Sequence, residues 1–271
     1  MQNNHYKKGD IVNWYLGLVS IVDIVQVAEK TFYDLEQIDC KLSCRVSEKL
    51  LVDYQKSNFD KRINKHTPHI LIVDNFYKDP MSVREIATQQ IYYSNDKAFK
   101  GQRSVCRFLL PNMKEEFERL LGLRIKNWLS YPTNGIFQIT SYTDPLVYHS
   151  DLQNYAAAIY LTPNAPVNAG TSFWRDRIYG CRRPPFHPLE KDRFTDDKER
   201  QETQNNIYND YNFIHNENWE LVDRVGSIFN RLVIWDAQLI HSATSYEHFK
   251  NSLHDVDNSR LVQLFFFDVE R

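Results

Sequence analysis

The chain has 271 residues, of which 42% are hydrophobic and 25% are charged, the balance of a folded globular protein. This composition excludes fibrous, collagenous and intrinsically disordered classes, and the length allows one large domain or two small ones. With 33 Lys and Arg against 35 Asp and Glu, the formal net charge of -2 supplies no overall field that would attract a polyanion. Nucleic acid is therefore not an expected partner.

The first 68 residues mix strand-like and helix-like patterns, and we expect them to form an N-terminal extension packed on the main domain. An apolar run over residues 11–28 follows a basic pair, but Asn13 and Asp23 interrupt it. Neither a cleaved signal peptide nor a membrane span is therefore expected.

The four cysteines lack the spacing of a zinc ribbon or of a disulfide scaffold. They are Cys40, Cys44, Cys106 and Cys181. Reduced thiols in a cytoplasmic protein, with no membrane partner, are the expectation.

One strand and two helices are predicted between the extension and residue 135. Residues 69–73 form a short apolar run typical of a buried strand. Asp79 and Pro80 suit an N-cap and a first helical position, which predicts a helix as far as about Gln90. Apolar residues then recur at helical spacing after Asn112, which predicts a second, amphipathic helix.

From Gly135 onward the pattern changes to short apolar runs, rich in β-branched and aromatic residues and separated by turns. Strands are predicted over residues 135–142, 155–161, 171–174, 228–235 and 261–269. Short strands without intervening helical patterns favour an antiparallel double sheet over a parallel one. We predict a mainly β protein of the α+β class, in which residues 69–271 form a jelly roll with flanking N-terminal helices.

A polar insert at about residues 180–218 interrupts this predicted domain. It is rich in Arg, Asp, Asn and Pro. A segment of this length inside a compact domain is usually a functional lid or a disordered loop. From the sequence, a lid and a solvated excursion without a role are equally possible.

One histidine and one carboxylate lie two residues apart in the run Tyr148-His149-Ser150-Asp151. In an extended strand both side chains project to one face and can chelate one metal, although so short a motif also arises by chance. His241 follows an apolar strand and a turn much further along the chain, and two imidazoles with one carboxylate form a facial triad that leaves open positions on Fe(II). Arg260 begins the last apolar strand, where a guanidinium needs a carboxylate partner.

In this order and on these strands, His149-x-Asp151, His241 and Arg260 resemble the Fe(II)- and 2-oxoglutarate-dependent oxygenase superfamily. The runs Tyr160-Leu161-Thr162-Pro163-Asn164-Ala165-Pro166 and Ala169-Gly170-Thr171-Ser172-Phe173-Trp174 are similar to a little-characterised branch found in bacterial and phage genomes. The likeness covers about residues 69–271. The fold of that superfamily is a double-stranded β-helix, or jelly roll, in agreement with the strand pattern.

The resemblance implies that His149, Asp151 and His241 bind iron and that Arg260 pairs with the distal carboxylate of 2-oxoglutarate. Tyr142 stands on the strand before the metal ligands, where similar enzymes often place a tyrosine that hydrogen-bonds the cosubstrate. Burial of its ring in the core is the alternative.

The arginine departs from the family pattern in its spacing, because many relatives have it closer to the distal histidine. Lys250 is the other cation between His241 and Arg260 and is therefore the alternative ligand of the cosubstrate. Arg260 is favoured because it alone begins a strand and because a guanidinium fits a carboxylate bidentately.

The implied cofactors are Fe(II), 2-oxoglutarate and O2, and the implied reaction hydroxylates a small molecule or peptide with release of succinate and CO2. Related halogenases have a small residue where this chain has Asp151, so hydroxylation or desaturation is favoured over halogenation. Trp174 and Arg175 are candidate substrate contacts, although a tryptophan there also suits core packing. Residues 101–107 could line the entrance with positive charge or form a solvated basic turn.

Two other functions are compatible with the same residues. One is a non-catalytic jelly-roll binding module, because a fold does not imply turnover. The other is a cupin-type metal protein that uses no 2-oxoglutarate, which typically has a further His or Glu ligand beside the first pair; none is evident near His149.

Overall fold

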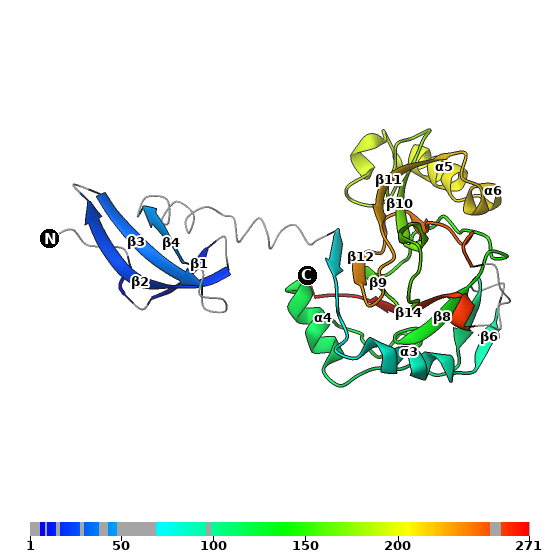
Figure 1. Ribbon diagram of the computed structural model, residues 1–271. Helices are drawn as coiled ribbons and strands as arrows, with labels where there is room; N and C mark the ends of the chain where they lie inside the picture. Colours follow the sequence, from blue (N-terminus) through cyan, green and yellow to red (C-terminus); the bar gives the residue numbers. More distant parts are fainter. Residues whose placement is uncertain are drawn as a thin grey trace. The chain divides into compact units, whose positions relative to one another are not determined.

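A computed structural model describes residues 6–8, 10–14, 17–27, 30–37, 43–47, 69–95, 99–249 and 256–270. The chain divides into two compact units, residues 1–67 and residues 68–271 (Figure 1). No helix in these described ranges is long and apolar enough to cross a membrane.

The first unit contains an antiparallel sheet of four strands in chain order. These strands are β1 (Ile11–Trp14), β2 (Gly17–Val27), β3 (Lys30–Gln37) and β4 (Ser43–Ser47). Thr31, Tyr33 and Leu35 alternate along β3 and are all buried, as expected where one face of a strand is covered. The described part of this unit is β structure, although the sequence mixes helical and strand patterns there.

The second unit is built on two antiparallel sheets. The larger has the order β5 (Ile70–Val73), β12 (Leu232–Asp236), β9 (Tyr155–Tyr160), β14 (Arg260–Phe267), β8 (Ile136–Thr140), β7 (Gln102–Ser104) and β6 (Tyr92–Ser94). The smaller has the order β11 (Trp219–Val225), β10 (Thr171–Asp176) and β13 (His241–Ala243). An isolated antiparallel bridge between His149 and His241 adds one more short segment beside β13.

The order of these strands identifies the fold as a jelly roll. Eight segments follow along the chain: β8, the His149 segment, β9, β10, β11, β12, β13 and β14. In this count the larger sheet pairs the sixth, third, eighth and first segments, and the smaller pairs the fifth, fourth, seventh and second. Two interleaved sheets of this kind are the double-sheet jelly roll, so the predicted fold class is confirmed.

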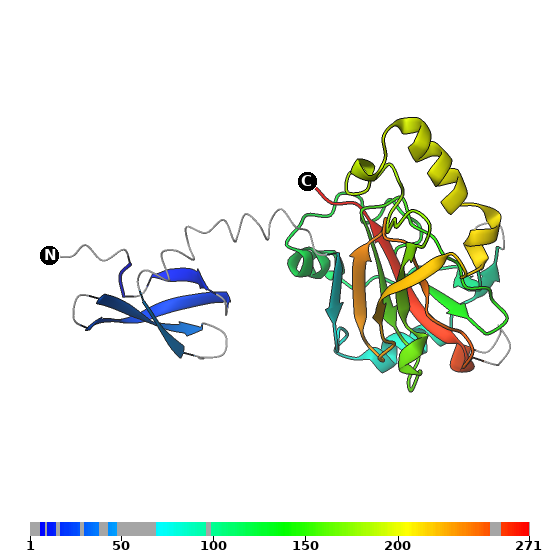
Figure 2. The same ribbon diagram turned by 90° about the horizontal axis from the view of Figure 1, so that it is seen from above.

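Two helices cover the outer face of the larger sheet (Figures 1 and 2). Helix α3 (Pro80–Thr88) begins at Asp79, whose side chain accepts a hydrogen bond from the Ser82 backbone N–H, as an N-cap does. Helix α4 (Met113–Leu121) buries Phe117 against Phe265 of β14. Since these contacts fill the outer face, the inner face of the larger sheet is left to face the smaller sheet.

The polar insert contains two helices, α5 (Asp197–Ile207) and α6 (Asp210–Ile214), which lie on the side of β10 and β11 (Figures 1 and 2). It also contains the single-turn helix η2 (Lys191–Arg193). Two further single-turn helices, η1 (Val167–Ala169) and η3 (Val256–Asn258), lie outside the insert. Ile207 of α5 packs in a buried cluster with Tyr148, Trp219 and Ile240. This insert is therefore an ordered, packed part of the domain.

Candidate metal centre

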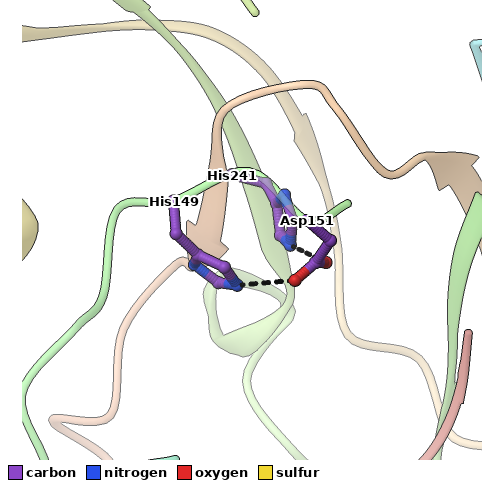
Figure 3. A group of neighbouring side chains, drawn as sticks. All are labelled: His149, Asp151 and His241. Atoms are coloured by element: carbon purple, nitrogen blue, oxygen red, sulfur yellow. Dashed lines mark ion pairs between the residues drawn. The ribbon is translucent and has the colours of Figure 1, made fainter. Parts of the chain in front are cut away.

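Three side chains that are distant in sequence converge at the inner edge of the smaller sheet: His149, Asp151 and His241 (Figure 3). One potential ligand atom from each lies within 4.8 Å of the others. His149 Nε2 is 3.7 Å from Asp151 Oδ1, and His241 Nε2 is 3.4 Å from Asp151 Oδ2. The structure thus brings together the three residues that the sequence singles out as metal ligands.

Backbone hydrogen bonds position the three candidate ligands. The His149 N–H donates to the His241 carbonyl at 3.1 Å, and the His241 N–H donates back to the His149 carbonyl at 2.8 Å. Residues that exchange both hydrogen bonds stand directly opposite each other, and their side chains share one face of the sheet. The imidazole centroids are accordingly 4.4 Å apart. Asp151 is anchored by its own N–H, which donates to the Ala237 carbonyl at 2.8 Å.

Each histidine is held in the tautomer that a metal requires. His149 Nδ1 lies 3.1 Å from the Val147 carbonyl, and His241 Nδ1 lies 2.7 Å from the Leu239 carbonyl. Because a carbonyl only accepts, each Nδ1 atom carries a hydrogen, which leaves each Nε2 atom as the position at which a metal would bind. Burial, with the neighbouring His149, lowers the pKa of His241 to about 4, so its ring is neutral at physiological pH.

Asp151 shows that a cation fits between these groups. Its Oδ2 atom is buried and has no hydrogen-bond partner among the described residues. A buried carboxylate oxygen without a donor is costly, and here it faces a nitrogen lone pair on His241. A divalent cation would satisfy all three groups, and two imidazoles with one carboxylate are the ligand set of Fe(II) sites that keep open positions.

The three residues open onto a cavity of about 450 Å³ between the two sheets. Trp235, Val262, Leu264 and Phe266 form an apolar part of its wall, and polar side chains, among them Lys100, Arg103 and Gln138, line the rest. A cavity of this size, with a few convergent polar groups in an apolar wall, is typical of small-molecule sites.

Arg260, at the start of β14, lines the same cavity. It is 7% exposed, and its Nε and Nη2 atoms donate to the carbonyls of Ala169 at 2.9 Å and Gly170 at 3.3 Å. Its guanidinium lies 5.6 Å from the ring centroid of Tyr160 and 6.0 Å from that of Tyr246. No acidic side chain in the described part of the chain forms an ion pair with it. The guanidinium is thus oriented and still lacks a counter-charge.

A family model described as a family of unknown function, DUF6445, matches residues 57–267. The chain belongs to this family. No curated protein matches the chain.

Three solved structures of HygX from Streptomyces hygroscopicus are similar to this DUF6445 member. The structure with nickel and 2-oxoglutarate is 15% identical at a TM-score of 0.41, and it covers 78% of this chain and 87% of HygX. The structure that also holds hygromycin B is 10% identical at 0.44, with coverage of 78% and 87%. The iron-bound structure is 12% identical at 0.37, with coverage of 78% and 86%. At this level of similarity, the cofactors of HygX do not carry over, and the chemistry of this chain rests on its own residues.

Three residues expected at the site lie elsewhere. Tyr142 is 55% exposed and does not line the cavity. Strand β8 ends at Thr140, so the chain has already left the sheet when it reaches Tyr142. The Trp174 indole N–H donates to Ser242 Oγ at 2.9 Å, and its ring packs on Tyr148. Arg175 forms an ion pair with Glu220 on the neighbouring strand.

The orientations of Trp174 and Arg175 follow from their places on β10. Side chains alternate between the two faces of a strand, so Trp174 points away from the face of Phe173, whose ring lies 6.4 Å from that of His241. Trp174 accordingly joins the cluster beneath the insert. The register of β10 against β11 shifts between Phe173 and Trp174, and beyond this irregularity Arg175 pairs with Glu220.

Two cavity residues were missed as site residues. Tyr246 lies on a segment without a strand or helix pattern, and burial raises the pKa of its hydroxyl. Arg103 lies on the three-residue strand β7, within the segment 101–107 that the sequence leaves undecided between an entrance and a solvated turn. Lys250, the alternative to Arg260, lies outside the described residues.

The insert contacts the segment that carries the metal ligands. The hydroxyls of Tyr208 and Ser150 are 3.0 Å apart, and Ser150 lies between His149 and Asp151. The Tyr148 N–H donates to the Phe213 carbonyl at 2.9 Å, and the Phe213 side chain lines the cavity. The insert therefore contributes Phe213 to the cavity and packs against the segment that carries the candidate ligands.

Replacing Tyr208 with Phe is expected to weaken Fe(II) binding by about 10-fold, the lower end of the effect of groups behind metal ligands. The ring stays, but Ser150 loses its partner and the turn between His149 and Asp151 is held less firmly. Anaerobic titration with Fe(II) measures the change. Tyr211→Phe, on an exposed position of the same insert, is the matched control. Equal affinity in Tyr208→Phe and wild type would contradict this role.

Proposed function

We propose that the protein is an Fe(II)- and 2-oxoglutarate-dependent oxygenase that uses O2 to hydroxylate a small molecule or peptide, with release of succinate and CO2. One observation carries the proposal: His149, Asp151 and His241 open onto the same cavity as Arg260, a buried guanidinium that forms no ion pair with an acidic side chain in the described part of the chain. A facial triad alone suits many metal proteins, whereas an oriented, unneutralised arginine beside it suits a cosubstrate that carries a second carboxylate.

In this proposal, each residue has a distinct task. His149, Asp151 and His241 hold the metal on one side and leave its other positions open to the cavity. When bound, iron and 2-oxoglutarate supply the activation of O2, and the protein orients and shields the reacting groups. Arg260 binds the distal carboxylate of 2-oxoglutarate, held in place by the carbonyls of Ala169 and Gly170.

Three features of the cavity support hydroxylation. Trp235, Val262, Leu264 and Phe266 exclude water from the reacting groups, which strengthens the electrostatic contacts of the cosubstrate. Asp151 occupies the ligand position that the related halogenases leave to a halide, so halide transfer is not proposed. The cavity volume of about 450 Å³ suits a small molecule or the side chain of a peptide.

The wild-type protein tests this proposal directly. Under anaerobic conditions, Fe(II) with 2-oxoglutarate is expected to give a visible charge-transfer band, and admission of O2 is expected to give slow succinate formation without substrate. Protein without Fe(II) is the control. A folded, iron-loaded protein that shows neither band nor succinate would be a binding module or a cupin-type metal protein instead.

A further inference from the structure

A second arginine faces the cavity from the edge of the larger sheet. Arg103 on β7 stands opposite Gln138 on β8, and Gln138 stands opposite Val262 on β14. All three residues line the cavity, so this cross-strand row forms part of its floor. Strand β8 lies between β7 and β14, so the backbone at Arg103 is two strand spacings, or about 10 Å, from the backbone of β14. It therefore lies across the cavity floor from the strand that carries Arg260.

Among the described residues, no acidic side chain forms an ion pair with the guanidinium of Arg103. Its central carbon lies 4.3 Å from the ring centroid of Phe99, which in turn contacts Tyr93 edge to face at 5.5 Å. Its Nε atom is buried and has no hydrogen-bond partner among the described residues. Burial lowers the pKa of Arg103, while Tyr93 and Asp151 act in the opposite direction.

The charges around the cavity leave Arg103 unneutralised. In the proposed oxygenase, the carboxylate of Asp151 belongs to the metal, and the two carboxylates of 2-oxoglutarate go to the metal and to Arg260. Iron and cosubstrate then cancel in charge, while Asp151 is one carboxylate against the three cations Lys100, Arg103 and Arg260 of the cavity lining, so the described lining keeps a net positive charge. Arg103 is half-buried and its Nε atom is fully buried, so leaving this atom without a partner is costly. A guanidinium is satisfied best by an oxyanion that accepts two parallel hydrogen bonds.

We infer that Arg103 binds an anionic group, a carboxylate or a phosphate, of the substrate that this oxygenase oxidises. The inference rests on the proposed function, because it assigns Arg260 to 2-oxoglutarate. The anion would sit at the β7 edge of the cavity, stacked beside Phe99, and the rest of the substrate would extend along the apolar wall toward the metal. Arg103 is thus a specificity-determining residue that selects anionic over neutral substrates.

Isothermal titration calorimetry on the full chain, loaded anaerobically with Fe(II) and 2-oxoglutarate, tests the inference. The probes are 3-phenylpropanoate, its neutral amide 3-phenylpropanamide, and phenyl phosphate. Wild type is expected to bind an anionic probe about 10- to 100-fold more tightly than the amide, the range for hydrogen bonds to charged groups. Preference for phenylpropanoate identifies a carboxylate site, and preference for phenyl phosphate identifies a phosphate site.

Arg103→Gln is expected to remove the preference for the anion and to leave the charge-transfer band with 2-oxoglutarate unchanged. Arg107→Gln is the matched control, since Arg107 lies on the same segment, is exposed and donates to the Leu129 carbonyl outside the cavity. It is expected to behave as wild type. Equal affinity of wild type for the anions and the amide, or a preference that persists in Arg103→Gln, would overturn the inference.

The charge-transfer band with 2-oxoglutarate distinguishes failure of this inference from failure of the proposed function. If Arg103→Gln loses the band while wild type shows it, Arg103 belongs to the cosubstrate, and the inference is wrong although the oxygenase proposal stands. If wild type shows no band but binds the anions through Arg103, the oxygenase proposal fails and the anion site stands.

Discussion

His241→Ala is expected to weaken Fe(II) binding by more than about 100-fold, beyond the 10- to 100-fold effect of losing a group behind a metal ligand. His241 is 5% exposed and its Nε2 atom faces Asp151, and alanine offers no ligand atom in its place. Succinate formation that depends on 2-oxoglutarate should fall to background. Anaerobic Fe(II) titration and succinate quantification measure the two effects.

His248→Ala is the matched control, because His248 is an exposed residue on the chain that follows β13 and does not line the cavity. It is expected to bind Fe(II) as wild type does. Circular dichroism separates a lost ligand from a lost fold, since the backbone hydrogen bonds between residues 149 and 241 do not need the imidazole. A folded His241→Ala protein with wild-type Fe(II) affinity would remove this residue from the metal centre.

Arg260→Gln is expected to lower the affinity for 2-oxoglutarate by about 10- to 100-fold, because the charge-assisted hydrogen bonds to its distal carboxylate are lost. The amide of Gln can still donate one hydrogen bond toward Ala169 or Gly170, so the local fold is expected to remain. Fe(II) affinity should be unchanged, since Arg260 is not a ligand. Titration of 2-oxoglutarate into the anaerobic Fe(II) protein, followed by the charge-transfer band, gives the affinity.

Arg260→Lys and Arg107→Gln are the control variants for this experiment. Lysine keeps the charge but not the planar fork, so its affinity for 2-oxoglutarate is expected between those of wild type and Arg260→Gln. Arg107→Gln removes an exposed charge away from the cavity and should leave the affinity unchanged. Wild-type affinity in Arg260→Gln would mean that another cation binds the cosubstrate.

The metal ligands could be predicted from the sequence only in part. The spacing of His149 and Asp151 places two ligands on one face of an extended segment. Their meeting with His241 depends on one backbone bridge, which no local pattern encodes and which only the family resemblance anticipates. Tyr142 fails as a cosubstrate contact because the end of β8 cannot be read to within two residues, a common error at element boundaries.

Elements with a clear local sequence pattern could be predicted, whereas elements without one could not. The strands of the larger sheet with clear apolar runs, such as β9 and β14, and the capped helix α3 lie where the sequence predicts them. Helix α5 was missed because it has almost no apolar stripe: it buries only Thr203 and Ile207. The packing of residues 1–68 on the jelly roll and the cytoplasmic location stay predictions.

The hydrogen bonds between the backbones of His149 and His241 have a consequence for metal exchange. They hold two of the three ligands in register through main-chain groups, and the Asp151 N–H fixes the third to Ala237. The entropy of ordering the ligands is therefore lost on folding of the chain and not on arrival of the ion. A metal ion at the proposed site is therefore expected to exchange without unfolding of the domain, in contrast to small domains whose fold exists only around a bound ion.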